Sequence, residues 1–286
     1  MRADRCSLIK NYYTQIDRTK IYVDYTNKRV KIVDLNNISV QNIKRIIHFS
    51  SKEHLGKIIC NCDSESLIIF EEAGFELEGK INGYFKGKDA FCMSYFIISD
   101  RKICSNFTKK ELLVKECLAV RDTFIHRSDK SKYCIRNANE NDIKEMVKLF
   151  STVFSTYPSP VYDEEFLKET MNGKVLYKVA VYDGKIIGIA SADMDKENLN
   201  AEMTDCATYP DYRGKGILSN IICSLEVDLK KKGFRTLYSL SRAINPGVNI
   251  VLSKHNYKYT GRLVNNCNIC GTFEDMNIWV KNINYN

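Results

Sequence analysis

The sequence of 286 residues contains no uninterrupted apolar stretch of roughly 18 residues, the length that a membrane-spanning helix needs. Its first ten residues have neither the apolar centre nor the small-residue cleavage site of a secretory signal. Proline is scarce, with 4 residues, and an apolar fraction of 44% is too high for a disordered or low-complexity chain. We therefore expect a folded cytoplasmic protein of one large or two ordinary domains, with no membrane segment.

The eleven cysteines are an odd number, scattered from Cys6 to Cys270 in a chain without an export signal. This pattern is typical of reduced thiols in a cytoplasm rather than of a disulfide framework. Two close spacings occur, Cys60 with Cys62 and Cys267 with Cys270. A structural zinc site usually needs four ligands, and no second CxxC spacing or histidine cluster accompanies these pairs, so we expect no metal.

An excess of positive charge is present, with 43 Lys and Arg against 35 Asp and Glu, for a net charge of +8. Residues 1–130 account for +6 of it and residues 131–286 for +2. The longest basic run is only Lys230 to Lys232, which a helix C-terminus explains. Nucleic-acid binding would need a clustered basic stripe with stacking aromatics, so we expect neither nucleic acid nor membrane as a partner.

From Tyr133 onward, strand and helix periodicities alternate in a regular order. Asp183-Gly184 predicts a tight hairpin turn, because both positions must accept positive φ. Gly233 after three lysines suits a helix C-terminus, and Asn245 suits the N-cap of another helix. The expected order is β-α-α-β-β-β-α-β-α-β-β, a mixed α/β domain with strands at 133–136, 175–182, 185–194, 201–208, 234–240, 259–265 and 275–281 and helices at 143–154, 163–171, 217–229 and 246–255.

The N-terminal part resembles the end of that pattern. A strand at 57–62, a helix at 66–73 and a strand at 90–97 match 236–240, 248–254 and 276–281. Upstream, a hairpin at 21–35 turns at Asn27-Lys28, and 39–49 predicts a helix. Chance similarity between two β-α-β-β stretches is the alternative. We expect a degenerate N-terminal domain over residues 1–104, a connecting helix within 105–130 and the main domain over 131–286.

The most informative segment is a strand followed by the glycine-rich turn Arg213-Gly-Lys-Gly216 and a long amphipathic helix. Such a turn presents backbone N–H groups at the positive end of a helix, which makes a pyrophosphate site. Arg213 and Lys215 add positive charge. The sequence matches neither the Walker A pattern nor GxGxxG, so a P-loop and a Rossmann site are excluded. An ordinary surface loop is the alternative.

The run Arg213-Gly-Lys-Gly-Ile-Leu218 resembles the (Gln/Arg)-x-x-Gly-x-(Gly/Ala) loop of the GNAT acyltransferase superfamily, and the element order over about 133–286 resembles its fold. The resemblance implies acetyl-CoA as co-substrate, a mixed and largely antiparallel central sheet, and a degenerate GNAT-like N-terminal half. Leu218 stands where the family has Gly or Ala, which leaves open how closely the pyrophosphate approaches. The cofactor-binding residues implied are Arg213, Gly214, Lys215, Gly216, Ile217 and Leu218 for the pyrophosphate, Cys206, Ala207 and Thr208 for the pantetheine arm, and Asn245.

The same resemblance implies direct acetyl transfer to an amine, with a carboxylate that accepts the proton. Glu202 lies in an Ala-Glu-x-x-x-Cys-Ala run similar to that of histone-type members, where Glu is the base. We expect Glu202 to be the base and Asp205, its competitor for that role, to contact the substrate ammonium. Strict alternation places the two carboxylates on opposite faces, unless a bulge intervenes. Leu252 occupies the position of the family's general-acid tyrosine, which leaves Tyr238 and Tyr257 as candidates for that role.

The C-terminal third resembles one branch of the family, whose members acetylate the N6 amine of β-lysine (3,6-diaminohexanoate), a precursor of a compatible solute. The residues that carry this resemblance are Ser241-Arg-Ala-x-Asn-Pro-Gly-x-Asn249, Gly261-Arg-Leu-Val-Asn-Asn-x-x-Ile-Cys-Gly271 and Glu274-Asp-Met-Asn-Ile-Trp279. Such a pocket must hold a carboxylate and a second ammonium. Arg242 suits the carboxylate, because its fork binds both oxygens. The expected polar liners are Asn245, Asn249, Asn265 and Asn266.

Three alternatives remain at this point. The first is a GNAT enzyme for another amine, such as a polyamine, an aminoglycoside or a protein lysine. The second is a nucleic-acid-binding protein, and the third is an acyl-CoA-binding protein without catalysis. The sequence leaves the oligomeric state open, a homodimer included.

Overall fold

The computed structural model describes residues 10–36, 38–125 and 133–283, which divide into two compact units. The N-terminal unit comprises the described residues of Met1–Glu78 and Phe91–Ile103, and the C-terminal unit comprises those of Gly79–Ala90 and Cys104–Asn286. The tip of one hairpin, residues 79–90, thus groups with the C-terminal unit, whereas the sequence placed it in a domain of residues 1–104. Within the described ranges, no helix is long and apolar enough to cross a membrane.

The N-terminal unit is a sheet with the strand order β1-β2-β3-β4-β6, in which β3 and β4 are parallel. Two helices cover it, and Ile43, Ile46 and Phe70 on them are fully buried. The expected strand at 57–62 and the expected hairpin and helices are present, and β1 is an additional strand. The elements are β1 (Tyr12–Ile16), β2 (Thr19–Asp24), β3 (Arg29–Ile32), α1 (Val40–Lys52), β4 (Lys57–Cys62), α2 (Leu67–Glu72) and β6 (Lys88–Phe96).

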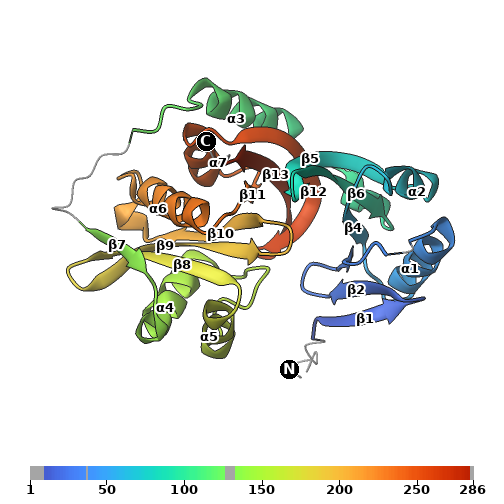
Figure 1. Ribbon diagram of the computed structural model, residues 1–286, viewed down its shortest axis with the longest axis horizontal. Helices are drawn as coiled ribbons and strands as arrows, with labels where there is room; N and C mark the ends of the chain where they lie inside the picture. The colour runs from blue at the N-terminus through green and yellow to red at the C-terminus, as the bar shows by residue number, and fades with distance from the viewer. Residues whose placement is uncertain (1–9, 37, 126–132, 284–286) are drawn as a thin grey trace, which may run out of the picture. The chain divides into compact units, whose positions relative to one another are not determined.

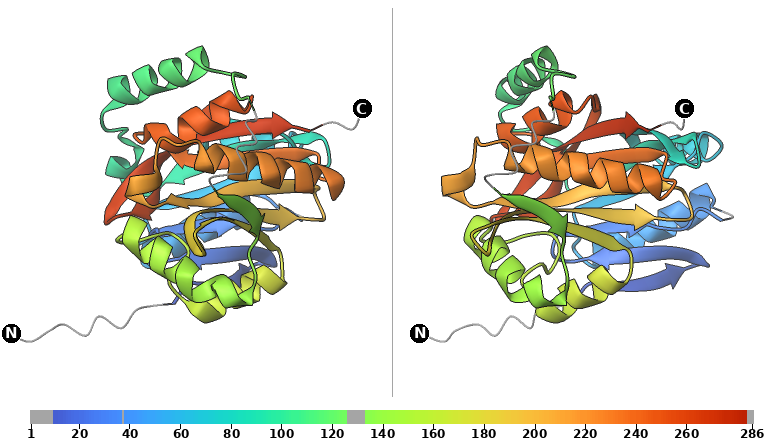
Figure 2. Two further views of the ribbon diagram at one scale, coloured as in Figure 1. Left: turned by 90° about the vertical axis from the view of Figure 1, so that its left-hand side faces the viewer. Right: turned by 60° about the vertical axis from the view of Figure 1, so that its left-hand side comes forward.

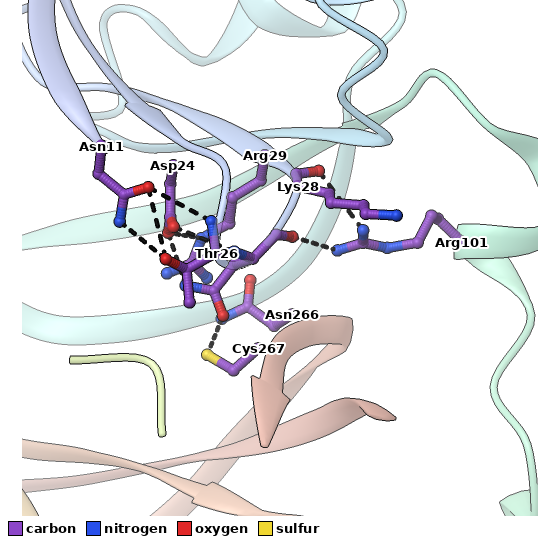
Figure 3. A network of polar contacts seen from close by, with 9 residues as sticks. Asn11, Asp24, Thr26, Lys28, Arg29, Arg101, Asn266 and Cys267 are labelled. Carbon is purple, nitrogen blue, oxygen red and sulfur yellow. Dashed lines mark hydrogen bonds and ion pairs between the residues drawn. The ribbon is translucent and has the colours of Figure 1, made fainter. Parts of the chain in front are cut away.

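The turn between β2 and β3 is held by Asp24 (Figure 3). Its carboxylate accepts hydrogen bonds from the backbone and side-chain nitrogens of Asn27, at 3.1 and 2.7 Å, and from Nε of Arg29, at 2.9 Å. Arg101 Nη2 donates to the carbonyl of Asn27 at 3.2 Å. Lys28 has φ of 46°, as a tight hairpin turn requires. The turn predicted at Asn27-Lys28 is therefore confirmed.

The sheet of the C-terminal unit has the order β5-β12-β13-β11-β10-β9-β8-β7. Strands β10 and β11 are parallel neighbours, and the other described pairings in this unit are antiparallel. This is the mixed, largely antiparallel sheet that the sequence predicted. Its strands are β5 (Glu76–Phe85), β7 (Cys134–Asn137), β8 (Val175–Tyr182), β9 (Lys185–Asp195), β10 (Asn200–Thr208), β11 (Thr236–Arg242), β12 (Lys258–Ile269) and β13 (Thr272–Asn282).

Helices cover both faces of this sheet, as Figures 1 and 2 show. Helices α6 and α7 share one core with the sheet, around Leu225 and Leu252, and α4 and α5 share another, around Phe150 and Leu167. Helix α3 packs on α7, where the Ser253 hydroxyl donates to a carbonyl of α3 at 2.6 Å. The helices are α3 (Phe107–Ala119), α4 (Ile143–Val153), α5 (Glu164–Asn172), α6 (Ile217–Lys231) and α7 (Pro246–Lys254).

Helix α6 follows the predicted apolar spacing closely. Its buried positions are Ile217, Ile221, Ile222, Leu225 and Leu229, which form one stripe toward the sheet. Burial of each such side chain stabilises the fold by about 1.5–3 kcal/mol. Gly233 ends the helix at φ of 88°, and the following N–H bonds back to the carbonyl of Leu229 at 3.1 Å. This is the Schellman pattern, which glycine adopts without strain.

Residues 79–90 brace the start of the two parallel strands. The Thr236 hydroxyl donates to the carbonyl of Gly83 at 3.0 Å, and the Asn200 side chain donates to the carbonyl of Tyr84 at 2.9 Å. The rings of Tyr84 and Tyr238 lie 5.6 Å apart. Because Asn200 and Thr236 are the first register pair of β10 and β11, these contacts fix the two strands at one end.

Candidate active site

A cleft of about 960 Å³ opens where β10 and β11 separate. The strands pair only from Asn200 to Glu202 on β10 and from Thr236 to Tyr238 on β11, although both continue for several residues. Beyond this point the walls come from β10, β11, the first turn of α6 and the outer side of α7. The C-terminal unit thus opens its only described parallel pair, which makes room for an extended ligand.

The glycine-rich turn Arg213–Gly216 lines part of the cleft. Gly214 and Gly216 have φ of 75° and 76°, and a Cβ added at either would meet no atom within 4 Å. Gly216 is the N-cap of α6 and offers no side chain to bond the N–H groups of the first turn. These N–H groups and the helix dipole therefore remain available to an anion. Arg213 Nε donates to the Thr208 carbonyl at 3.2 Å, which ties the turn to the end of β10.

The other predicted cofactor contacts lie on the same walls, with one exception. Cys206, Thr208, Lys215 and Leu218 line the cleft. Asn245 also lines it, and its side chain caps α7 by accepting the Gly247 N–H at 3.0 Å. Ile217 lines the cleft and packs close to β9. The side chain of Ala207 is buried in the core under α4 instead, so this residue can offer only its backbone to a ligand.

A bulge in β10 decides where the two carboxylates lie. Thr204 pairs with Ser191 and Ala207 with Ile189, so β10 has one residue more than β9 between these pairs. Asp205 is the bulged residue and has φ of 49°. The charges of both Asp205 and Glu202 raise the pKa of the nearby Tyr157, after burial as the larger cause. The bulge thus overrides the strict alternation that would separate the two carboxylates.

Only one of the two carboxylates belongs to the described cleft wall. Asp205 lines the cleft, is 7% exposed and accepts a hydrogen bond from the Ser191 hydroxyl at 2.7 Å. Glu202 is not among the described lining residues, and its carboxylate accepts a hydrogen bond from Tyr238 at 3.3 Å. Glu202 and Tyr238 also form the last register pair of β10 and β11 before the two strands separate. Of the two candidate bases, the structure therefore places Asp205 on the described cleft wall and Glu202 beside Tyr238.

Burial shapes the protonation of Asp205. Loss of water raises its pKa to about 6, and hydrogen bonds from Ser191 and Tyr157 partly offset this rise. The group is thus ionised at neutral pH and is still a stronger base than an exposed aspartate. This combination suits a carboxylate that must take up a proton during turnover.

Tyr157 is a cleft residue that sequence reasoning missed. It lies between α4 and α5 in the sequence, lines the cleft, and its side chain lowers the pKa of the nearby Asp205 carboxyl. The Tyr157-Pro-Ser-Pro160 run signals only a helix break, and nothing local indicates that the ring of Tyr157 turns toward β10.

Leu252, at the position of the family's general-acid tyrosine, is buried in the core. Tyr238 and Tyr257, the two expected substitutes for the missing tyrosine, are buried and are not among the described lining residues.

The predicted substrate residues separate into two groups. Arg242 lines the cleft near Met276 and pairs with Glu274. Asn249 is fully buried and bonds Ser241, Asn277 and Trp279, so it braces the strands and no longer counts as a liner. Neither of the other two expected liners is among the described cleft residues: Asn265 is half-buried and its backbone donates to Asp275 at 2.7 Å, and Asn266 is 1% exposed.

A further wall comes from the segment after α3, which sequence reasoning treated only as a connection. Thr123, Phe124 and Ile125 line the cleft. The Phe124 ring stacks on His255 at 3.9 Å, and the Ser219 hydroxyl lies 2.7 Å from Nε2 of the same histidine.

No part of the described chain gathers three or more Cys, His, Asp or Glu side chains that could hold a metal.

Comparisons with known proteins agree with this geometry. The family described as "Acetyltransferase (GNAT) family" matches residues 143–248, which include β10, the turn and α6. The chain is 39% identical to a beta-lysine N(6)-acetyltransferase of Methanosarcina mazei, over 80% of this chain and 92% of that protein. The chain belongs to the GNAT acetyltransferase family.

Two further relatives of this GNAT chain match over nearly the whole length. A beta-lysine N(6)-acetyltransferase of Methanococcus maripaludis is 34% identical over 93% of this chain and 97% of that protein. The N-acetyltransferase YodP of Bacillus subtilis is 31% identical over 91% of this chain and 94% of that protein. Because the coverage is so high, these relatives include counterparts of the N-terminal unit as well. The predicted family and its N-acetyltransferase activity are thus confirmed.

The buried charge of Asp205 lowers the stability of the folded protein at neutral pH. In the unfolded chain the carboxyl has its ordinary pKa of 3.8, and in the folded protein about 6. The folded state therefore binds the proton more tightly, and stability falls as pH rises between these values. Above about pH 6 the loss amounts to about 3 kcal/mol. We expect Asp205→Asn to raise the free energy of unfolding at pH 7.5 by about 2–3 kcal/mol and to change it little at pH 4.

Urea unfolding at the two pH values measures this effect. The difference between wild type and variant should shrink as pH falls from 7.5 to 4, because the wild-type carboxyl then becomes neutral as well. An Asp205→Asn protein that is less stable than wild type at pH 7.5 would contradict the assignment of a strained, buried charge.

Proposed function

We propose that this chain transfers acetyl from acetyl-CoA directly to the N6 amine of β-lysine. The observation that carries the proposal is the buried Asp205 on the wall of a cleft that the Arg213–Gly216 turn also lines. The names of the two relatives from methanogens support this choice of amine. The product, N6-acetyl-β-lysine, would retain a carboxylate and one ammonium, as a compatible solute does.

The turn and α6 bind the anionic part of acetyl-CoA. The pyrophosphate would accept hydrogen bonds from the N–H groups that follow Gly214 and Gly216, with Arg213 and Lys215 near by. Beyond Glu202 the backbone of β10 no longer pairs with β11, so its free edge can bond the amides of the pantetheine arm. Ser239 already bonds one of these groups, the Met203 carbonyl, at 2.7 Å.

Asp205 prepares the amine for attack. An aliphatic ammonium has a pKa near 10.4, so its deprotonation at pH 7 costs roughly 4.6 kcal/mol. Asp205, directly or through a water molecule, accepts this proton before the neutral amine attacks the thioester carbonyl. The C–N bond then forms and the C–S bond breaks, so that the sulfur of CoA leaves as a thiolate. The nitrogen gives up its second proton in this step, and the thiolate takes up a proton, so that the products are the amide and the free thiol of CoA.

Tyr157 is the acid that we assign to this thiolate. Burial, followed by the charges of Asp205 and neighbouring groups, raises its pKa well above the usual range, so it holds its proton throughout the working pH range. We expect Tyr157→Phe to lower kcat about 10- to 100-fold with little change in the KM of acetyl-CoA, because the ring packing is retained.

Steady-state rates with thioesters of different leaving thiols check this role of Tyr157. The deficit of Tyr157→Phe should shrink with a thiol of lower pKa, which leaves without protonation. A deficit that is the same for all thiols would show that Tyr157 only positions Asp205.

A direct assay tests the proposed function. Purified protein is incubated with acetyl-CoA and β-lysine, L-lysine, spermidine, an aminoglycoside or a lysine peptide, and NMR identifies the acetylated nitrogen. We expect N6 of β-lysine to give the highest kcat/KM. Faster turnover of spermidine would assign the enzyme to polyamines, and binding of acetyl-CoA without turnover of any amine would leave an acyl-CoA-binding protein.

We infer that the N-terminal unit is a degenerate copy of the same fold. Its strands β3 and β4 are parallel with α1 between them, as β10 and β11 are with α6 between them. Strands β4 and β6 then pair antiparallel, as β11 and β13 do. Residues 33–39 contain no glycine, and the Ser39 side chain already caps α1 by accepting the Asn42 N–H at 3.2 Å. The copy therefore lacks the features that make a phosphate site.

A further inference from the structure

Arg242 and Glu274 lie on the cleft face of two neighbouring strands. Arg242 on β11 is directly opposite Met276 on β13, and both line the cleft. Glu274 precedes Met276 by two residues on the same strand, so it shares this face. Its side chain is 13% exposed and accepts a hydrogen bond from Arg242 Nη2 at 2.6 Å. Glu274 is not among the described lining residues, but it lies on the same face of β13 as Met276 and bonds the lining residue Arg242.

Each member of this ion pair leaves part of its bonding capacity unused. Arg242 donates from Nη2, whereas its Nε is buried and has no hydrogen-bond partner among the described residues. The Oε1 atom of Glu274 accepts from both Arg242 and Thr272, and Oε2 has no partner in the described part of the chain. An unpaired buried donor is unfavourable, so Arg242 Nε calls for an added acceptor such as a carboxylate. The second oxygen of Glu274 is able to accept a hydrogen bond from a positively charged donor.

We propose that Arg242 and Glu274 together recognise the β-amino acid end of the substrate. Arg242 binds the carboxylate, and Glu274 binds the ammonium on C3. This proposal rests on the proposed function and names the residue, Glu274, that selects a diamine with an acid group over a simple ω-amino acid. The N6 amine, at the far end of the chain, remains free to reach Asp205.

Charge balance favours this arrangement. The substrate carboxylate would have Arg242 as its neighbour, and the ammonium would have Glu274, so the four charges alternate in sign. The β-amino acid end itself adds no net charge beside Arg242 and Glu274, and each of its ions gains a hydrogen-bonded counter-ion. If the pair only braced β11 against β13, its loss would instead affect all substrates alike.

The experiment compares two substrates that differ at one group. β-Lysine carries the C3 ammonium, and 6-aminohexanoate lacks it but keeps the carboxylate and the N6 amine. We expect Glu274→Gln to lower kcat/KM for β-lysine about 10- to 100-fold, which is the loss of one charge-assisted hydrogen bond. The same variant should change kcat/KM for 6-aminohexanoate by less than about 3-fold. The readout is the ratio of the two values, which does not depend on the fraction of folded enzyme.

Thr272→Val is the matched control, because it removes the other partner of the same Glu274 oxygen and keeps the carboxylate. We expect it to leave the ratio unchanged. Equal losses for both substrates in Glu274→Gln would overturn the proposal in favour of a structural ion pair. Wild-type enzyme that acetylates both substrates equally well would overturn it too. That result would still show that the enzyme acetylates an amine that carries a carboxylate. Turnover of neither substrate would instead refute the proposed function.

Discussion

Replacement of Asp205 by Asn should lower kcat about 100- to 10,000-fold, the largest effect expected of a single change in this cleft. Asn has nearly the same shape, and its amide oxygen can still accept the hydrogen bond that Ser191 donates at 2.7 Å. What is lost is the ability to accept a proton from the amine. The KM of acetyl-CoA should change little, because the substitution leaves the Arg213–Gly216 turn and the start of α6 unaltered.

The pH profile makes this expectation specific. Asp205 works as a base only when ionised, and its pKa is raised to about 6. For the wild type, kcat/KM should therefore rise with pH up to about 6 through this group and then lose that dependence. The residual activity of Asp205→Asn should lack this step. A wild-type profile whose base ionises near 4 would contradict a buried catalytic aspartate.

Glu202→Gln is the matched control for Asp205→Asn. It makes the same change of acid to amide on the same strand, three residues away, at a carboxylate bonded by Tyr238. We expect a loss of less than about 10-fold, through the neighbouring charge rather than through proton transfer. A large loss in Glu202→Gln with a small one in Asp205→Asn would restore Glu202 as the base that the sequence run suggests.

The two carboxylates show what periodicity can and cannot predict. The alternation of apolar and polar residues along β10 is a local signal, and it predicted the strand itself correctly. The bulge is visible only in the pairing with β9, where Thr204 and Ala207 face Ser191 and Ile189. No residue in the run Ala201 to Thr208 requires the extra residue to lie at Asp205 rather than at its neighbours. The choice between Glu202 and Asp205 therefore depended on a register that the sequence does not encode locally.

Helices and tight turns were easier to predict, because their signals are local. The α6 stripe, Gly233 at its end and the cap at Asn245 all stand where the sequence placed them. The asparagines were harder, because an amide suits a buried network as well as a substrate pocket. The Asn249 amide makes hydrogen bonds with five other groups, and nothing in the neighbouring sequence indicates this. Tyr157 was missed for the opposite reason, since a loop residue gains its role from distant strands.

Gly216→Ala should raise the KM of acetyl-CoA about 100-fold while kcat at saturation changes much less. Gly216 has φ of 76°, which costs a residue with a Cβ about 1–2 kcal/mol. The added methyl group would also stand in the open space at the start of α6, where the pyrophosphate must approach the N–H groups. Relief of the strain by rotation of the backbone would turn those N–H groups away from the anion.

Gly184→Ala separates these two effects, because Gly184 has φ of 72° and, like Gly216, no atom within 4 Å of an added Cβ. It lies in the β8–β9 hairpin and is not among the described cleft residues. Both variants should lose a similar 1–2 kcal/mol of stability in urea unfolding. Only Gly216→Ala should weaken acetyl-CoA binding, measured by calorimetric titration. Equal weakening in both variants would mean that backbone strain alone, and not the phosphate contact, explains the requirement for glycine in this turn.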